Sequence, residues 1–414
     1  MLANEAIAAN QKRVIRHMTE LHETEYCLVG DGAYAKELLR QLTEQQLTLP
    51  KVWLVSSTQV GYPDIEQYIE AQHSVIEQQI IVLGTGHFQL EMIHRLKSKC
   101  TKESMFWDLM LCAPKDQPAI PSGSQKNDNY IIYIDMYANI NEAAYLSQLF
   151  TALRTAGVKV KLHHPLDVLS DQYLSAAESV IVWNGSSSTF LPIMQRLEAL
   201  NVPLTFAECG FFPQSQYFYF DQLGVNDQSQ LKLDNLNWVT AEHINALETI
   251  RSLFFAGVTP YPDSGYIFVP LQVPNDSNIL NNSSFTSGMQ AFIDFIEKKY
   301  SSEKIIFKAH PKDRMKSTYS LKHGTFSEDN SRSLILSAKL VHGINSSVLY
   351  EAALAKKAVI AEGNCLLTSV TAPIESILAA MVARQHHIDQ TFFDEQKLHR
   401  FSHFKESLVT ALVK

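Results

Sequence analysis

Cysteine is scarce in the sequence and never closely paired. Five cysteines are spread over 414 residues, and no two of them form a CxxC motif. An odd number of scattered cysteines favours reduced thiols in a cytoplasm over a disulfide framework or a zinc site. The five are Cys27, Cys100, Cys112, Cys209 and Cys365.

Basic residues are fewer than acidic residues. Lysine and arginine number 35 against 43 aspartates and glutamates, so the formal net charge is −8 with histidine neutral. A surface that binds a polyanion cannot come from a bulk charge of this sign. We therefore do not expect nucleic acid as a partner.

Long apolar runs are missing as well. The longest candidates, such as LSAAESVIVW, are shorter than the roughly 18–20 residues that a bilayer span requires, and they contain polar residues. The first twenty residues predict an amphipathic helix without the apolar region and cleavage site of a signal peptide. These absences predict a soluble, cytoplasmic protein. A peripheral contact with the inner membrane or with a biosynthetic complex stays open.

What the sequence does have is the alternating pattern of an α/β protein. Its length and its 46% hydrophobic content suffice for two or three domains with proper cores. Short β-branched runs alternate with helical patterns, which predicts parallel sheets covered by helices. We expect an N-terminal Rossmann-like segment at 1–120, a linker at 121–129, a Rossmann-like domain at 130–262 that is irregular after 211, another at 263–385, and a helical tail at 386–414.

A glycine pattern follows the first clear strand. Gly30, Gly32 and Ala35 form GxGxxA at a predicted strand-to-helix turn, which is the spacing of a dinucleotide-binding loop. The next strand ends in Ser56, Ser57 and Thr58, without the acidic residue that would hold a ribose. The pattern therefore favours a structural or protein-contact role over bound NAD.

Two strand ends in the last third of the chain carry polar motifs. His310 and Pro311 follow KIIFKA, and Asn345, Ser346 and Ser347 follow LVHGI. Open α/β sheets bind ligands at the carboxyl ends of their strands, and a helix that begins with serine can hold a phosphate on its free N–H groups. Together the motifs predict a site for one nucleotide phosphate. Each motif alone has a structural alternative, an ordinary turn or a helix cap.

A second His-Pro pair shows that such a motif can be structural. His163, His164 and Pro165 follow the strand VKVKL in the same way. We interpret them as a turn.

Four motifs together carry a resemblance to a known family. FKAHPKD, HGINSSVLYEAALAKKAVIAEG, FVPLQVPNDSNI and FAECGFFPQSQYFYFDQLGVNDQSQL resemble the bacterial capsule-polysaccharide biosynthesis proteins and β-Kdo transferases, which are sialyltransferase-like GT-B glycosyltransferases. The resemblance covers about residues 130–370. It implies two Rossmann-like domains that face a cleft, a CMP-activated ulosonic acid as donor, and a donor site mainly on the C-terminal domain.

For the nucleotide site, the resemblance implies that His310, Ser346 and Ser347 hold the CMP phosphate. Pro311 and Asn345 belong to the same motifs. Lys308, Lys312 and Arg314 add positive potential or form part of a solvated rim. No cofactor is expected, and a metal-independent reaction fits a monophosphate leaving group.

Two carboxylates are candidates for the chemistry. The resemblance implies that Asp276, in LQVPNDSN, is the nucleophile of a retaining double displacement. Glu208, in FAECGFF, is expected to exchange a proton with the acceptor hydroxyl if burial moves its pKa towards neutrality. Relatives often have a second acid where this sequence has Cys209. The alternatives stay open: Asp276 as a turn cap, and Glu208 as the partner of a buried cation.

The acceptor side is expected to involve Asn184 and Gly185 in IVWNGSSS and Gln214 in FFPQ. For Asn226 a loop-forming role is equally consistent. The expected function is transfer of Kdo or another nonulosonic acid to a capsule or lipopolysaccharide glycan. Two alternatives remain: a non-catalytic glycan- or nucleotide-binding subunit of a polysaccharide export assembly, and a GT-B enzyme with a UDP- or GDP-sugar donor.

Overall fold

Three β-sheets organise the part of the chain that the structure describes. The computed structural model describes residues 13–30, 33–54, 79–84, 93, 96, 100–101, 103–110, 129–136, 144–165, 167, 169–186, 190–273, 277–285, 288–311, 313 and 316–413. The chain divides into two compact units, the first comprising 1–142, 159–180 and 187–202, and the second 143–158, 181–186 and 203–414.

The N-terminal sheet has five parallel strands in the order β1-β5-β4-β2-β3. Alternate residues of its strands point to two separate cores, with Tyr26 and Leu28 in one and Cys27 and Val29 in the other. Its elements are β1 (Arg13–His17), β2 (Tyr26–Val29), α2 (Ala33–Glu44), β3 (Val52–Leu54), β4 (Ile80–Leu83) and β5 (Met105–Met110).

The predicted N-terminal helix is wrong where the structure describes the chain. Residues Arg13–His17 form β1, which pairs in parallel with β5. The β-branched pair Val14 and Ile15 suits a strand, and a partner strand about ninety residues away in sequence supplies the hydrogen bonds that a local pattern does not reveal.

The first glycine of the pattern after β2 has a packing reason, whereas Gly32 lies outside the described residues. Gly30 has a φ of +122°, and a Cβ there would lie 2.6 Å from the carbonyl oxygen of Gly84. Gly84 in turn leaves no room for a Cβ beside Ala35. The turns after β2 and β4 therefore approach each other too closely for any larger residue, which accounts for these glycines without a nucleotide.

The middle sheet mixes parallel and antiparallel pairing, in the order β16-β10-β9-β8-β6-β7. β6 and β7 are parallel, whereas β10 is antiparallel to both β9 and β16. Its elements are β6 (Tyr130–Ile134), α5 (Ser147–Thr155), β7 (Lys159–His163), α6 (Asp171–Ala176), β8 (Ser179–Trp183), α7 (Leu191–Ala199), β9 (Leu204–Cys209) and β10 (Tyr217–Asp221).

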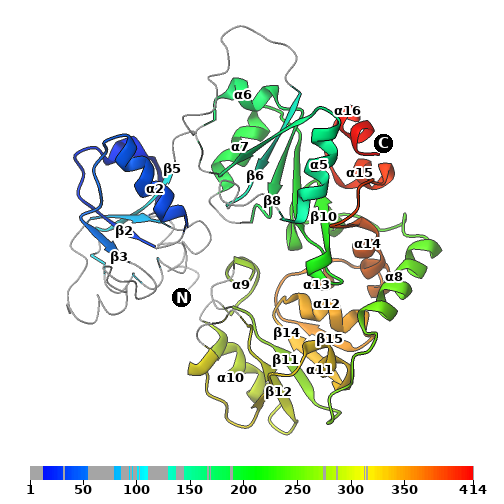
Figure 1. Ribbon diagram of the computed structural model, residues 1–414. Coiled ribbons are helices and arrows are strands. Elements are labelled where there is room, and N and C mark those ends of the chain that lie inside the picture. Colours follow the sequence, from blue (N-terminus) through cyan, green and yellow to red (C-terminus); the bar gives the residue numbers. More distant parts are fainter. Residues whose placement is uncertain are drawn as a thin grey trace. The chain divides into compact units, whose positions relative to one another are not determined.

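The C-terminal sheet is parallel, in the order β13-β12-β11-β14-β15 (Figure 1). Side chains of the central strand alternate between two cores. Ile267 and Val269 pack with α10, while Tyr266 and Phe268 pack with α11 and α12. The elements are β11 (Ile267–Pro270), α9 (Ser277–Asn282), α10 (Met289–Lys299), β12 (Ile305–Lys308), β13 (Thr325–Phe326), α11 (Ser331–Ser337), β14 (Leu340–Gly343), α12 (Ser347–Leu354) and β15 (Ala358–Ala361).

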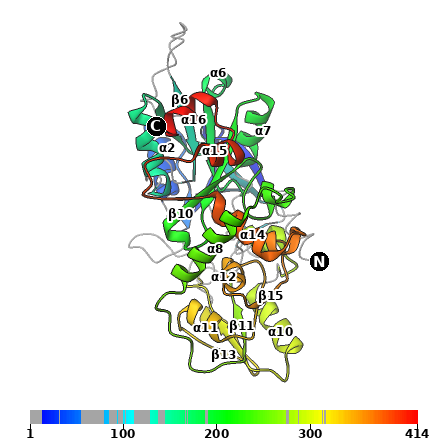
Figure 2. The ribbon, with the colours of Figure 1, turned by 90° about the vertical axis from the view of Figure 1, so that its right-hand side faces the viewer.

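After this sheet the chain returns to the middle one. α13 (Leu366–Ser369) and α14 (Ile374–Arg384) lead to β16 (Gln385–His387), which pairs with β10. α15 (Glu395–Phe401) then packs on β10 and α16 (Glu406–Val413) on α5 (Figure 2). The tail is helical as predicted, but its first residues complete a sheet that begins more than two hundred residues earlier.

The region after residue 211 is more regular than expected. It contains β10 and the 14-residue helix α8 (Ala241–Phe254), which packs on α14. Several short 3-10 helices connect the longer elements: Met18–Leu21, Ala144–Leu146, Gln214–Gln216, Asn226–Gln228, Gln230–Lys232 and Lys316–Thr318. Within the described residues, no helix has the length and apolar character needed to cross a bilayer.

Candidate functional site

A pocket of about 420 Å³ lies at the carboxyl edge of the C-terminal sheet. Its floor comes from the segments that follow β11, β12 and β14. β11 is central, and the chain continues from it to β12 on one side and later to β14 on the other. A reversal of this kind opens a crevice at the strand ends, and the volume suits a small-molecule ligand.

The His-Pro motif forms one wall of the pocket. Lys308, the last residue of β12, lines it together with His310 and Pro311. Behind them the chain turns, because the N–H of Asp313 donates to the carbonyl of His310 over 2.9 Å. The Tyr319 hydroxyl in turn donates to the Asp313 carboxylate over 2.7 Å. These two hydrogen bonds stabilise the turn that begins at His310.

The serine motif lines the same pocket. Ser346 is the N-cap of α12, and its hydroxyl accepts a hydrogen bond from the Val348 N–H over 3.3 Å. Ser347 is the first helical residue, and both serines line the pocket. The first turn of a helix leaves N–H groups without intrahelical partners, and its dipole favours an anion. The pocket therefore brings two basic side chains and a helix N-terminus to one place.

Asn345 lines the pocket but has a different set of contacts. Its Oδ1 accepts from Gln272 Nε2 over 2.9 Å, and its Nδ2 donates to the carbonyl of Asn278 over 3.0 Å. Its backbone N–H donates to Gln272 Oε1 over 3.1 Å. Both ends of the amide thus have protein partners, so a direct bond to phosphate is not its main contact.

Glu351 is a pocket residue that the sequence reasoning missed. It lies on α12 one turn after Ser347 and lines the same pocket. Burial raises its pKa to about 7, although the positive charge of Arg332 opposes the shift. The sequence contained a signal for Glu351, because it follows Ser347 by four residues and residues four apart on a helix share a face. This carboxyl changes charge near neutral pH beside the predicted phosphate site.

Three residues outside the C-terminal sheet also line the pocket, namely Phe211, Gln214 and Asn226. Asn226 has a left-handed φ of +53° in a loop that Asp221 organises. The Asp221 carboxylate accepts from the N–H groups of Leu223 and Gly224 at 2.9 and 3.2 Å, and from that of Gln230 at 3.0 Å. Both interpretations of Asn226 are thus compatible with its place, because it forms part of a loop and also faces the pocket.

Glu208 belongs to a separate group at the ends of β8 and β9. Its carboxylate accepts a hydrogen bond from Asn184 Nδ2, and its other oxygen accepts the N–H of Cys209 over 2.9 Å. Burial, followed by the charge of Glu208, raises the pKa of the Cys209 thiol. Glu208 and Asn184 are thus together, but neither is among the residues that line the pocket with His310.

Gly185 has a packing role in this group. Its φ is +73°, and a Cβ would lie 2.8 Å from a ring carbon of Phe206. Only glycine fits this close approach without displacing the ring.

The structure does not describe three of the residues that the sequence analysis named. Asp276 lies outside the described residues, as do Lys312 and Arg314. The nucleophile assignment therefore stays a prediction.

The second His-Pro pair is a buried turn, in which Asp167 accepts from the His164 N–H over 3.1 Å and lies 3.1 Å from the His163 ring.

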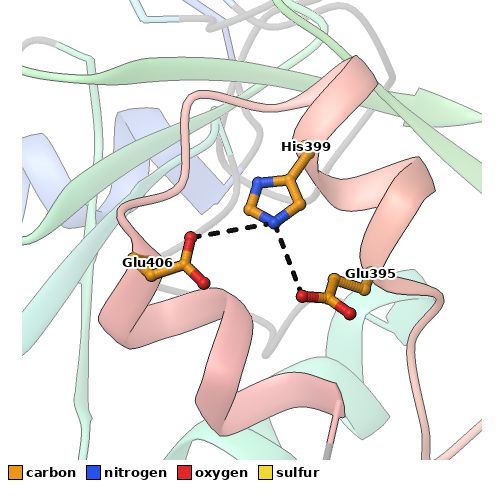
Figure 3. Close-up of side chains that lie close together, drawn as sticks. All are labelled: Glu395, His399 and Glu406. Carbon is orange, nitrogen blue, oxygen red and sulfur yellow. Dashed lines mark ion pairs between the residues drawn. The ribbon is translucent and has the colours of Figure 1, made fainter.

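One group of three among the described residues has the composition of a metal site. Figure 3 shows the His399 ring of α15 between the carboxylates of Glu395 and Glu406, with N–O distances of 3.8 and 3.7 Å. All three side chains are exposed, and none of them lines the pocket. Ordinary surface ion pairs account for this group, and we assign it no metal.

The part of the chain that carries these motifs matches a known protein family. Residues 261–370 match the family described as "Capsule polysaccharide biosynthesis protein". The match contains the His-Pro and Asn-Ser-Ser motifs and every element of the C-terminal sheet. The predicted resemblance is confirmed for this segment.

The solved structures that match the chain include two of Thermosulfurimonas dismutans KpsC. The β-Kdo 2,7 transferase is 17% identical with a TM-score of 0.43, and the match covers 63% of this chain and 92% of that one. The β-Kdo 2,4 transferase is 16% identical with a TM-score of 0.45, over 61% and 90%. The UDP-GlcNAc 2-epimerase of Methanocaldococcus jannaschii is 14% identical with a TM-score of 0.29, over 68% and 97%. No curated protein matches the chain.

The expected α/β class is confirmed, because the described sheets are largely parallel and alternate with helices along the chain.

Proposed function

We propose that the protein is a glycosyltransferase that moves Kdo or a related nonulosonic acid from a CMP-activated donor to a capsule or lipopolysaccharide glycan. The observation that carries the proposal is the pocket itself. Lys308, His310, Ser346 and Ser347 line one cavity, within the segment that matches the capsule polysaccharide biosynthesis family.

The charges in the pocket suit a monophosphate. Its lining includes the basic side chains of Lys308 and His310, the N-terminus of α12, and the carboxyl group of Glu351. As the bond between sugar and phosphate breaks, the leaving CMP gains negative charge. A histidine donor, an ammonium group and helix N–H groups stabilise that charge in place.

The proposed chemistry is a double displacement. The Asp276 carboxylate attacks the anomeric carbon, the carbon–oxygen bond to phosphate breaks, and CMP leaves with the electron pair. The acceptor hydroxyl then attacks the same carbon, and the bond to Asp276 breaks. Retention of configuration follows from the two inversions.

The proton from the acceptor is assigned to Glu208. Its hydrogen bond from Asn184 would orient the carboxylate, and Gln214 supplies a neutral amide to the pocket lining. The acceptor side therefore has polar groups suited to sugar hydroxyls.

Calorimetric titration with CMP, UDP and GDP tests the donor. We expect CMP to bind at least tenfold more tightly than UDP or GDP, and His310→Ala to weaken CMP by a further tenfold or more. His399→Ala is the matched control, because this histidine is exposed on α15 and outside the pocket. Its CMP affinity should equal that of the wild type.

The other outcomes identify the alternatives. Tighter binding of UDP or GDP would indicate a nucleoside diphosphate sugar as donor. No binding of any nucleotide would indicate a glycan-binding subunit and overturn the proposal.

A further inference from the structure

Asn226 presents an unused amide to the pocket. Its side chain is half-buried and lines the cavity together with His310 and Ser347. Within the part of the chain that the structure describes, no residue forms a hydrogen bond with this amide. The loop uses the backbone instead, because the carbonyl of Asn226 accepts from the N–H of Ser229 over 3.2 Å. Both ends of the Asn345 amide are occupied, whereas the Asn226 amide is available to a ligand.

Two buried carboxylates hold the loop on either side of Asn226. Asp221 is 0% exposed and accepts from the Ser229 hydroxyl. Asp227 is 4% exposed and accepts from the hydroxyl of Ser369 at the end of α13. Hydrogen bonds to an ionised acceptor are among the stronger ones in proteins. The loop that presents the amide is therefore pre-organised.

The backbone conformation of Asn226 does not by itself require an asparagine. Its φ of +53° lies in the left-handed region, which glycine adopts without a steric penalty. Asparagine tolerates this region better than most residues, but at some cost. Residues held in such conformations cluster at ligand-binding sites. What asparagine adds over glycine at this position is the amide in the pocket.

The chemistry of the pocket indicates which part of a ligand meets this amide. Lys308, His310 and the helix that begins at Ser347 offer positive charge and N–H groups to a phosphate. The Asn226 amide is neutral and offers one donor group and one acceptor, which suits a hydroxyl group, since a hydroxyl also donates and accepts. In a CMP-activated donor the transferred sugar is bonded directly to the phosphate. Such a sugar therefore shares the cavity of about 420 Å³ with the phosphate.

The ribose of the nucleotide also carries hydroxyls, but the C-terminal sheet has its own pocket residues for a nucleoside. Ser331, at the start of α11, is one of them. Asn226 comes from the loop after β10, which belongs to a different sheet. The part of the donor that a transferase must present to a second substrate is the sugar.

We propose that Asn226 binds a hydroxyl group of the sugar that the CMP-activated donor carries. This inference rests on the proposed transferase function. The Nδ2 group donates to the hydroxyl oxygen, or the Oδ1 atom accepts its proton. One hydrogen bond of this kind contributes about tenfold to affinity.

The test compares the Kd values for CMP and for CMP-Kdo, measured by calorimetric titration without acceptor, in the wild type and in Asn226→Gly. Glycine keeps the left-handed backbone and removes the amide. CMP lacks the sugar, so its Kd reports on the rest of the pocket. We expect the Kd for CMP-Kdo to rise by about tenfold and the Kd for CMP to change less than about twofold.

Asn201→Gly is the matched control. Asn201 has a similar left-handed backbone, with a φ of +52°, but it is exposed after α7 and does not line the pocket. Both of its Kd values should equal those of the wild type. The melting temperatures of the two glycine variants should stay near that of the wild type, because glycine adopts this conformation without strain.

Asn226→Asp is a second variant, for use if the glycine variant is unstable. Aspartate also tolerates a left-handed backbone, but its carboxylate cannot donate and repels the carboxylate of Kdo. The Kd for CMP-Kdo should therefore rise more than the Kd for CMP.

Two results would overturn the inference. An unchanged Kd for CMP-Kdo in Asn226→Gly would make this residue a loop former. An equal rise of both Kd values would mean that the amide binds the nucleotide and not the sugar. If the wild type binds neither CMP nor CMP-Kdo, the proposed function itself fails, and this inference fails with it.

Discussion

Arg384 Nη1 and Asp221 Oδ2 lie 2.9 Å apart, and both side chains are fully buried. The guanidinium also donates to the Ser229 hydroxyl over 2.7 Å and lies 3.8 Å from the centre of the Tyr219 ring. The pair joins the end of α14 to β10 and to the loop that presents Asn226. It therefore connects the fold of the middle domain to one wall of the pocket.

Breaking this pair should destabilise the protein strongly. Arg384→Met leaves the Asp221 carboxylate buried without its cation, and we expect the free energy of unfolding to fall by about 3–5 kcal/mol in urea titrations. The control is Arg400→Met, which removes an arginine that stacks on Trp238 at the surface. It should cost about 1 kcal/mol or less. An equal loss in both variants would contradict the importance of the buried pair.

Glu351 should make CMP binding depend on pH. Because burial raises its pKa to about 7, the carboxyl is protonated below neutral pH and negative above it. The ionised form would repel a phosphate held by Lys308, His310 and α12. We expect Glu351→Gln to gain CMP affinity relative to the wild type as pH rises from 6 to 8, by less than about tenfold. Comparing the CMP affinity of the two proteins at each pH cancels the effect of other groups that titrate in both. A pH-independent difference would contradict this role.

The same carboxyl has a consequence for stability. A folded-state pKa above the usual value of 4.5 means that the folded protein holds the proton more tightly than the unfolded chain. The stability that Glu351 contributes is present below about pH 4.5 and is lost as pH rises towards 7. Thermal unfolding of Glu351→Gln should lack this part of the pH dependence. An identical pH profile in both proteins would contradict the raised pKa.

Asp276→Asn tests the proposed nucleophile. We expect kcat to fall by on the order of 10³ or more, because the amide cannot form the covalent intermediate, while CMP affinity stays within a few fold. Asp263→Asn is a suitable control, since Asp263 is an exposed residue that pairs with Lys304. A variant at position 276 that retains full activity would show that the nucleophile is another group.

Glu208→Gln distinguishes a proton-transfer role from a structural one. The amide oxygen can still accept from Asn184, but the bond to the Cys209 N–H is weakened or lost. We expect kcat to fall by about 10²-fold with CMP affinity unchanged. A lower melting temperature with unchanged kcat would make Glu208 a structural residue of the β8 and β9 ends.

Most strands and the pocket motifs were predictable because their signals are local. β2, β11, β12 and β14 are short apolar runs that end in glycine or proline turns, and their side chains alternate between two faces. A parallel sheet places the ends of such strands at one edge. The proximity of His310 to Ser346 and Ser347 in one pocket follows from that rule.

Other features needed the tertiary structure, because their causes lie far away in the sequence. β16 is three residues long and becomes a strand only by pairing with β10, while β1 depends on β5. The sequence motif predicts Asn345 as a nucleotide-binding residue. In the structure, its side-chain amide instead bonds to Gln272 and Asn278. The carboxyl of Glu351 looks ordinary in the sequence, and only its burial in the folded chain changes its pKa. The sequence by itself determined which turns carry polar groups; folding decided which of those groups stay available to a ligand, because burial and hydrogen bonding depend on neighbours that no local pattern contains.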